Sequence, residues 1–250
     1  QGPLSEDLMA KLAGEELREV PYYGILETKI GGADCVISQT GFTGEKGYEI
    51  YVRDAHENAE KMWNAVLEAG EEFGLMVIAP AHHRRIAAGI LSWGQDLDHE
   101  TSPFQVNLSY QVPRNKAADY IGKEELERQR SMIDEGKHPF KMKMVGITLG
   151  GKEITDYAPD FWLIADPDGN DMGYVTSPWW SPELGTNIAL AWVPWASSEV
   201  GTKLLVRLPD EYSESSGVPV EGEIVEVPFR ESVNPNKREV QAAKGLDFAD

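Results

Sequence analysis

The sequence predicts an α+β protein: a mixed sheet-and-helix domain over residues 1–138, followed by a small C-terminal antiparallel β-barrel over residues 139–250. Two observations lead to this prediction. In the first part, short runs rich in β-branched residues alternate with stretches whose apolar residues recur at helical spacing. From Met142 onward, short strand-like runs follow one another at regular spacing with turn residues between them, which is typical of a small all-β barrel or sandwich.

The first helix and hairpin are predicted from capping and turn residues. Ser5 and the acidic residues after it favour a helix start, and Gly14 favours its end. Residues 25–30 and 33–39 have the composition of strands, and Gly31-Gly32 between them is typical of a hairpin turn.

Two further helices are predicted before the middle of the chain. The first covers residues 54–70, with Trp63 in the apolar stripe that faces the core. The apolar run over residues 75–79 is expected to be a short buried strand. Pro80 then favours a helix start, and residues 81–93 are predicted to form the second helix.

The C-terminal part is predicted to contain six short strands. They cover residues 142–149, 161–165, 173–176, 188–193, 203–207 and 223–227.

Composition narrows the classes of function. The formal net charge is −19 with the carboxylates spread along the chain, which argues against nucleic acid or an anionic membrane as a partner. No apolar run reaches the roughly 18 residues that a membrane-spanning helix needs. The single cysteine, Cys35, excludes an internal disulfide and suits a reducing compartment. We therefore expect a cytoplasmic protein and leave open whether it forms a homo-oligomer.

A metal site is not expected. His82 and His83 are adjacent and point about 100° apart on a helix, so they cannot chelate one ion together. No pair of cysteines or His-x-x-x-His spacing completes a ligand set.

The stretch most informative about function is residues 39–51, Q-T-G-F-T-G-E-K-G-Y-E-I-Y. It places three glycines between two strand-like runs, where glycine serves a positive φ or lets another group approach the backbone. Glu49 lies inside the second run, beside Tyr48. A carboxylate there must face solvent or hold a donor-rich partner, because burying it unpaired is costly.

This stretch resembles the G-Y-T-G-E-x-G-[FY]-E signature of the folate-dependent aminomethyltransferase superfamily, with Phe42 in place of the tyrosine. The superfamily includes the glycine-cleavage T-protein, folate-dependent demethylases, and the C-terminal halves of dimethylglycine and sarcosine dehydrogenases. Further segments resemble it in order. They are residues 85–97, residues 119–126 (D-Y-I-G-K-E-E-L), residues 172–177, residues 181–191 and the closing Val227-Pro228-Phe229.

The resemblance implies a folate-binding first domain, a C-terminal barrel, and tetrahydrofolate bound in a channel between them. Glu49 matches the carboxylate that holds the pterin, and Phe42 matches a ring that lines the pocket. Arg85 is a candidate cation near the cofactor or an acidic substrate, although a solvated helix face explains it equally well. Tyr22 is a candidate pocket aromatic or a residue that packs on the sheet. Trp93 is a candidate for ring stacking or for the core.

The implied reaction is one-carbon transfer to tetrahydrofolate from a small methylated or aminomethylated donor. We rank a demethylase-like methyl transfer first, because Ala81 and Ala87 replace an arginine and a glutamate of the glycine-cleavage pattern and because of the stretch Ser102-Pro103-Phe104. The alternatives are a glycine-cleavage aminomethyltransferase, a non-catalytic folate-binding relative, and a domain of a flavin-dependent dehydrogenase.

The catalytic residue is expected to lie outside these 250 residues. The sequence opens with Gln1-Gly2-Pro3, a motif that in the superfamily follows a long N-terminal region containing the catalytic aspartate. We therefore expect this chain to be a fragment and assign no catalytic residue within it.

Overall fold

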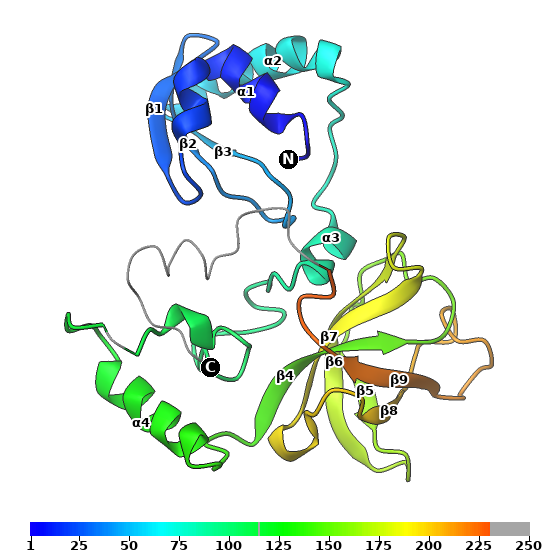
Figure 1. The fold of residues 1–250 in the computed structure, drawn as a ribbon. Helices are drawn as coiled ribbons and strands as arrows, with labels where there is room; N and C mark the ends of the chain where they lie inside the picture. Colours follow the sequence, from blue (N-terminus) through cyan, green and yellow to red (C-terminus); the bar gives the residue numbers. More distant parts are fainter. Residues whose placement is uncertain (115, 231–250) are drawn as a thin grey trace. The chain divides into compact units, whose positions relative to one another are not determined.

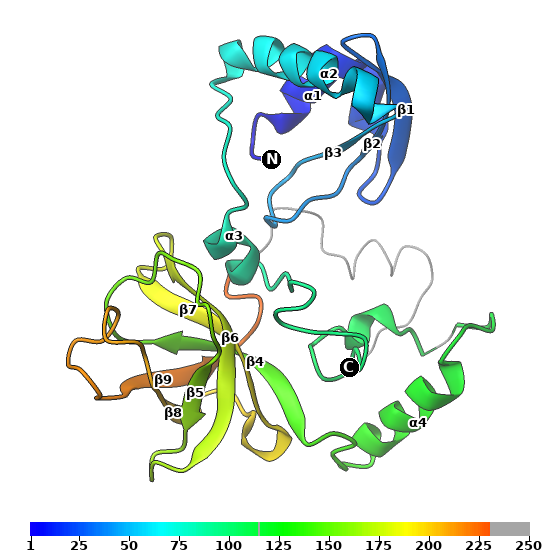
Figure 2. The same cartoon turned by 180° about the vertical axis from the view of Figure 1, so that it is seen from behind.

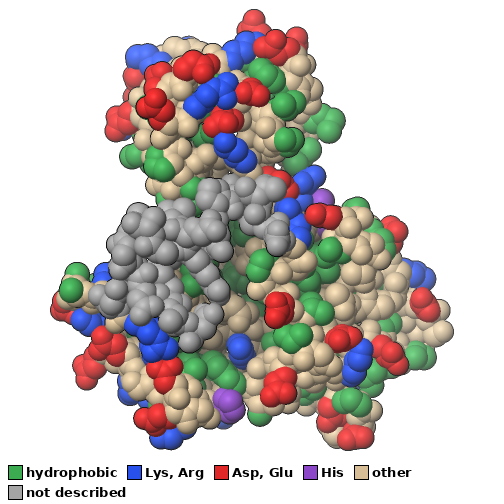
Figure 3. Space-filling view, in the orientation of Figure 1, with side chains coloured by type: hydrophobic (Ala, Val, Ile, Leu, Met, Phe, Trp, Pro, Cys, Tyr) green, Lys and Arg blue, Asp and Glu red, His purple; other side chains and the backbone are tan. Residues whose placement is uncertain are grey.

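The structure is a computed structural model that describes residues 1–114 and 116–230. The chain forms two compact units, and the division falls between Ala81 and His82 (Figure 1). Residues 82–138, which the sequence analysis assigns to the first domain, pack with the barrel in this division. The domain boundary predicted after residue 138 stays a prediction. On the face that Figure 3 shows, acidic side chains are spread over both units.

The first unit is a three-stranded antiparallel sheet in the order β1-β2-β3, with helices on one face. Its elements are α1 (Ser5–Ala13), η1 (Glu15–Glu19), β1 (Ile25–Ile30), β2 (Ala33–Ser38), β3 (Glu49–Val52), α2 (Ala55–Gly70) and η2 (Glu71–Phe73). The predicted hairpin is confirmed, since β1 and β2 pair in register from Ile25 opposite Ser38 to Ile30 opposite Ala33.

Alternation along the strands separates the two faces of this sheet. Ile30 and Ile37 are fully buried and, with partly buried Ile50, pack against residues of α1 and α2. Residues on the other face are more exposed, with Ile25 at 65% and Tyr51 at 56%. The sheet therefore has a covered face and an open face, and the period of two decides which side chains lie on each.

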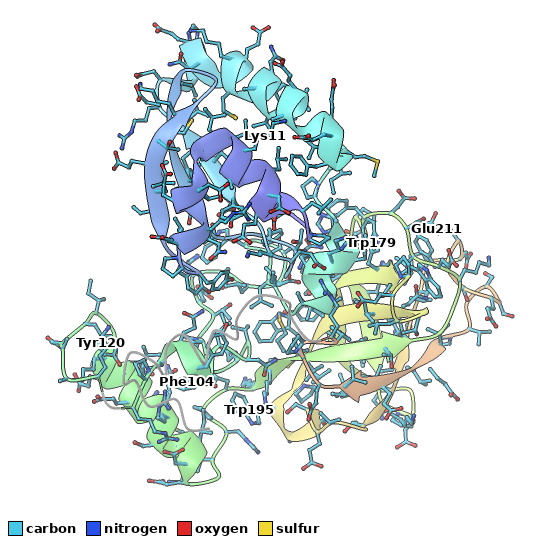
Figure 4. All side chains as sticks on the ribbon, turned by 45° about the horizontal axis from the view of Figure 1, so that its top comes forward. Lys11, Phe104, Tyr120, Trp179, Trp195 and Glu211 are labelled. Atoms are coloured by element: carbon cyan, nitrogen blue, oxygen red, sulfur yellow. The ribbon has the colours of Figure 1, made fainter. Side chains whose placement is uncertain are left out.

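The helices of the first unit are joined by a surface contact at their ends. Lys11 Nζ of α1 (Figure 4) lies 2.5 Å from Glu72 Oε1 and 3.4 Å from the carbonyl oxygen of Ala69, which lies in the last turn of α2. Because both charged side chains are about half exposed, this ion pair contributes little to stability.

Two sequence predictions in this unit were wrong. Residues 75–79 form no strand, and Met76 is 78% exposed. An apolar run becomes a buried strand only beside a pairing partner. Among the described residues the sheet consists of β1, β2 and β3, and residues 75–79 pair with none of them. Trp63 is 48% exposed on the outer side of α2 and does not lie in the core.

The second unit consists of a closed barrel with a short helix against it and a longer helix before it. Its elements are α3 (His82–Ala87), η3 (Ser109–Gln111), α4 (Lys123–Asp134), β4 (Met142–Leu149), β5 (Trp162–Ala165), β6 (Asp171–Ser181), β7 (Thr186–Pro194), η4 (Trp195–Ser197), β8 (Lys203–Val206) and β9 (Val220–Val225). The barrel order is β4-β7-β6-β5-β8-β9, so the predicted antiparallel β-barrel is confirmed.

Strands β4 and β7 are buried on both sides, which explains their nearly continuous apolar sequences. Val145 and Ala191 point into the barrel core, whereas Met144 and Leu190 belong to an outer cluster that contains Ile86 of α3. Figure 2 shows α3 beside β6 and β7. Apolar burial on both faces thus joins α3 to the barrel.

The helix predicted over residues 81–93 is much shorter in the structure. It ends at Ala87, and Gly89 follows with a φ of +67°. The amide of Ile90 donates to the carbonyl of Arg85 at 2.8 Å, and the amide of Gly89 donates to Ile86 at 2.9 Å. A glycine in the left-handed region closes the helix here, as is common at helix C-termini. The structure contains no described helix long and apolar enough to cross a membrane.

The close pairing of β6 and β7 generates a stability prediction. A Cβ added at Gly173 would lie 2.1 Å from the carbonyl oxygen of Trp192, a backbone atom of the paired strand β7. We expect Gly173→Ala to lower the free energy of unfolding by about 2–3 kcal/mol in urea denaturation followed by tryptophan fluorescence.

Gly150→Ala is the matched control, because its Cβ would meet the nearest atom at an ordinary 3.7 Å. We expect it to change the unfolding free energy by less than about 0.5 kcal/mol. Equal effects of the two substitutions would contradict the tight β6–β7 pairing.

Candidate functional site

The glycine-rich loop between β2 and β3 closes around the side chain of Gln1. A Cβ at Gly41 would lie 2.2 Å from Gln1, and one at Gly47 would lie 2.4 Å from it. Gly44 has a φ of +74°. Two of the three glycines therefore permit a close approach and the third permits a turn. The carbonyl of Lys46 accepts from the Gly2 amide at 2.8 Å, which fastens the loop to the segment before α1.

Strand register brings three segments to one end of the sheet. Glu49 is the partner of Ser38 across β2 and β3. The Tyr23 amide donates to the carbonyl of Gln39 at 3.1 Å, and the Gln39 amide donates to the carbonyl of Gly24 at the same distance. The start of β1, the end of β2 and the start of β3 therefore meet at this end.

Three of the predicted site residues are contributed by these segments. Glu49 begins β3, Tyr22 precedes β1, and Phe42 lies in the glycine-rich loop with 41% of its surface exposed. Tyr22 is half-buried and contacts Tyr23, with ring centroids 4.2 Å apart. A carboxylate and several aromatic rings thus belong to one edge of the first unit.

Two hydroxyl groups hold the Glu49 carboxylate through a single oxygen. Thr40 Oγ1 donates to Glu49 Oε2, and the Tyr51 hydroxyl donates to the same oxygen at 3.2 Å. Within residues 1–114 and 116–230, Oε1 of Glu49 accepts no hydrogen bond. The side chain is half-buried, so this second oxygen is the part of the carboxylate left for a donor from outside.

The Glu49 charge acts on Tyr51. Its negative charge, and then the hydrogen bond that it accepts, raise the pKa of the Tyr51 phenol above its ordinary value. The neutral phenol is favoured because only the protonated hydroxyl can donate to the carboxylate.

Arg85 lies in the second unit and is 1% exposed. Its Nη1 donates to Asp96 Oδ2 at 2.8 Å and to the carbonyl of Ile90 at 3.0 Å, and its Nη2 donates to Ser177 Oγ at 2.7 Å. These contacts join α3, the following loop and β6. The solvated helix face considered for Arg85 is therefore wrong, and its role toward a cofactor stays a prediction.

Asp96 completes this buried ion pair. Its Oδ2 also accepts from the Ser92 amide at 2.8 Å, and its Oδ1 accepts from the hydroxyls of Thr176 and Ser177 at 2.6 Å. The carboxylate thus has donors at both oxygens, which offset the cost of burying its charge.

His82 connects the ion pair to aromatic side chains of the barrel. Its Nδ1 accepts from Arg85 Nε at 3.3 Å, so Nε2 carries the proton that faces the Tyr157 hydroxyl. The ring lies 5.2 Å from that of Trp179, which projects from β6 toward α3 (Figure 4). Burial, and then the Arg85 charge, lower the pKa of His82, which favours its neutral form.

The remaining predicted residue, Trp93, lies in the loop after α3 and is 68% exposed. It is not a core residue, and its stacking on a cofactor ring stays a prediction. The described residues include no group of three or more His, Cys, Asp or Glu side chains placed to hold a metal ion.

Four residues of these networks received no role from the sequence: Thr40, Tyr51, Asp96 and Ser177. Asp96 was visible as the aspartate of a G-x-D motif, and Tyr51 follows Glu49 at the spacing of one strand face. No local signal marks Thr40 or Ser177, because each meets its partner only through strand pairing or long-range packing.

The Tyr51–Glu49 contact predicts a change in titration. Glu49→Gln removes the charge, so we expect the pKa of Tyr51 to fall toward its ordinary value in a titration of ¹³C-labelled tyrosine by NMR. Glu27→Gln is the control, because Glu27 lies on the open face but pairs with Arg53 at 3.3 Å. An unchanged Tyr51 titration in Glu49→Gln would contradict the contact.

The buried ion pair predicts a large loss of stability. Asp96→Asn leaves the Arg85 charge buried without its counter-ion, and we expect it to lower the unfolding free energy by about 3 kcal/mol or more in urea denaturation. The control is Asp171→Asn, which removes the exposed partner of Arg207, and we expect a cost below about 1 kcal/mol. Similar losses of unfolding free energy in the two variants would contradict a larger contribution from the buried pair.

Two family models match the sequence, one after the other. The model described as GCVT N-terminal domain matches residues 1–116, and the one described as glycine cleavage T-protein C-terminal barrel domain matches residues 143–229. An aminomethyltransferase of Caldanaerobacter subterraneus subsp. tengcongensis is 34% identical over 194 residues, which are 76% of this chain and 48% of that protein. An aminomethyltransferase of Chloroherpeton thalassium is 30% identical over 231 residues, which are 92% of this chain and 58% of that protein.

A solved structure agrees with the fold. The glycine cleavage system aminomethyltransferase T of Bartonella henselae superposes with a TM-score of 0.71 at 24% identity, over 93% of this chain and 58% of that one. The chain thus spans about half the length of the relatives that it matches. With both family models matched in order and the barrel present, the chain belongs to the folate-dependent aminomethyltransferase superfamily.

Proposed function

We propose that this chain is part of a tetrahydrofolate-dependent aminomethyltransferase and that Glu49 holds the donor edge of the pterin. The observation that carries this proposal is the Glu49 carboxylate, which is fixed through Oε2 while Oε1 accepts no hydrogen bond from the described residues. The names of the relatives support the reaction class. Because the chain spans about half of those proteins, their activity is proposed here for the protein of which this chain is a part.

The residues around Glu49 fit a flat ring with N–H donors at its edge. A carboxylate that accepts from such an edge gives a strong and directional contact, because the acceptor is charged. Tyr51 and Phe42 are partly exposed, at 56% and 41%, and offer aromatic surface at the same end of the sheet. A small planar ligand could therefore bury its faces against these rings while its edge reaches the carboxylate.

The chain's own residues would bind and orient, and they carry no assigned chemistry. When bound, tetrahydrofolate supplies a reduced ring nitrogen that accepts the one-carbon unit. Glu49 would fix the orientation of the ring. Such positioning lowers the barrier to transfer from an aminomethylated donor, because the reacting groups are already aligned. Phe42 and Tyr22 are proposed to exclude water from the ring. We assign the proton transfer to none of the described residues.

Demethylase-like methyl transfer is the second candidate. Packing in the structure accounts for some of the residues on which the sequence analysis based it. Ala87 is 2% exposed within an apolar cluster of α3 and the barrel, so packing accounts for a small apolar residue there. Phe104 is also buried, and Ser102 Oγ donates to Gln129 Oε1 at 2.6 Å. Ala81 is the departure from the glycine-cleavage pattern that packing leaves unexplained. The relatives therefore favour aminomethyl transfer over the demethylase that the sequence ranks first.

The proposal predicts folate binding that depends on Glu49. We expect isothermal titration calorimetry to detect tetrahydrofolate binding, and Glu49→Ala to weaken it by roughly tenfold to a hundredfold, the range for losing a hydrogen bond to a charged group. The protein used is the natural full-length product that contains this chain.

Glu27→Ala is the matched control, since it removes a carboxylate from the same open face. It should bind tetrahydrofolate like the unchanged protein. Binding that is equal in all three proteins would contradict the assigned contact, and absence of binding in all three would contradict the function.

A further inference from the structure

Two hydroxyl groups donate to the same oxygen of Glu49, an arrangement that a carboxylate does not need in order to bind a ligand. Thr40 reaches Glu49 from the loop after β2, and Tyr51 reaches it from two residues along β3. Both donate to Oε2. If their purpose were only to solvate the charge, donors spread over both oxygens would serve as well.

The number of hydroxyl protons decides which group donates in each hydrogen bond of this network. The Thr40 hydroxyl has one proton, which it donates to Glu49. In the contact between Thr40 Oγ1 and Ser38 Oγ, at 3.2 Å, the proton must therefore come from Ser38. Ser38 is 8% exposed and is the strand partner of Glu49, so the chain of hydrogen bonds starts from a fixed point in the sheet.

The direction of the chain fixes one rotamer of the carboxylate. Two donors from different segments converge on one oxygen of the carboxylate, and they hold its plane in one orientation, because an intermediate rotation would lose both bonds. The other oxygen is then left for a ligand, and its lone pairs require a donor, not an acceptor, on the ligand edge.

We propose that Thr40 and Tyr51 are positioning residues of the Glu49 site: they hold the carboxylate so that its second oxygen accepts from the N–H edge of a folate ring. This inference rests on the proposed function, because it concerns the same site. It adds two residues that act through Glu49 and do not touch the reacting atoms. Preorganisation of this kind raises affinity by removing the cost of ordering the acceptor on binding.

The test measures tetrahydrofolate affinity by calorimetry in the full-length protein for Tyr51→Phe, Thr40→Val and Thr40→Ser. We expect the Phe and Val variants each to bind roughly tenfold more weakly, and Thr40→Ser to bind like the unchanged protein, because serine restores the hydroxyl. Thr28→Val is the control, since the Thr28 hydroxyl contacts the carbonyl of Ala13 at 3.4 Å, away from Glu49.

Thermal unfolding separates positioning from a structural role. Tyr51 is 56% exposed, so we expect Tyr51→Phe to leave the melting temperature unchanged. This variant therefore tests the inference even if Thr40→Val does not fold. Weak binding by Thr40→Ser, or wild-type affinity in Tyr51→Phe, would overturn the inference. If Glu49→Ala alone weakens binding, the proposed function stands without it, whereas a protein that binds no folate at all refutes both.

Discussion

The alternation of side chains along β3 is the constraint on which the candidate site depends. Ile50 and Val52 pack into the apolar cluster beneath the sheet, so Glu49 and Tyr51 must lie on the open face. A shift of register by one residue would place the carboxylate in the core without donors, at a cost of several kcal/mol. The same burial that stabilises the sheet therefore presents the carboxylate to a ligand and sets Tyr51 beside it.

A second constraint operates in the barrel unit, where a buried charge must be neutralised. The Arg85–Asp96 pair is almost completely inaccessible, and hydroxyls of β6 complete the hydrogen bonds of the aspartate. Such a pair stabilises little compared with apolar packing, but its hydrogen bonds join α3 and the loop after it to β6. His82 extends this fixed arrangement to Tyr157 and Trp179.

Local signals predicted the fold well, and long-range contacts account for what they missed. The barrel and the first hairpin followed from turn residues and alternation, which act within a few positions. The strand expected over residues 75–79 was wrong because burial depends on a partner that sequence spacing does not reveal. Likewise, Glu49 could be selected from its motif, whereas the role of Thr40 depends on its contact with Glu49, which the sequence alone does not indicate.

We propose that a folate ring binds at the end of the sheet where Glu49 begins β3. The most direct test is NMR of the ¹⁵N-labelled full-length protein during titration with tetrahydrofolate. We expect saturable changes in the amide signals of residues 38–51, with Thr40, Glu49 and Tyr51 among the most affected. Saturable binding that leaves all the signals of residues 38–51 unchanged would contradict it.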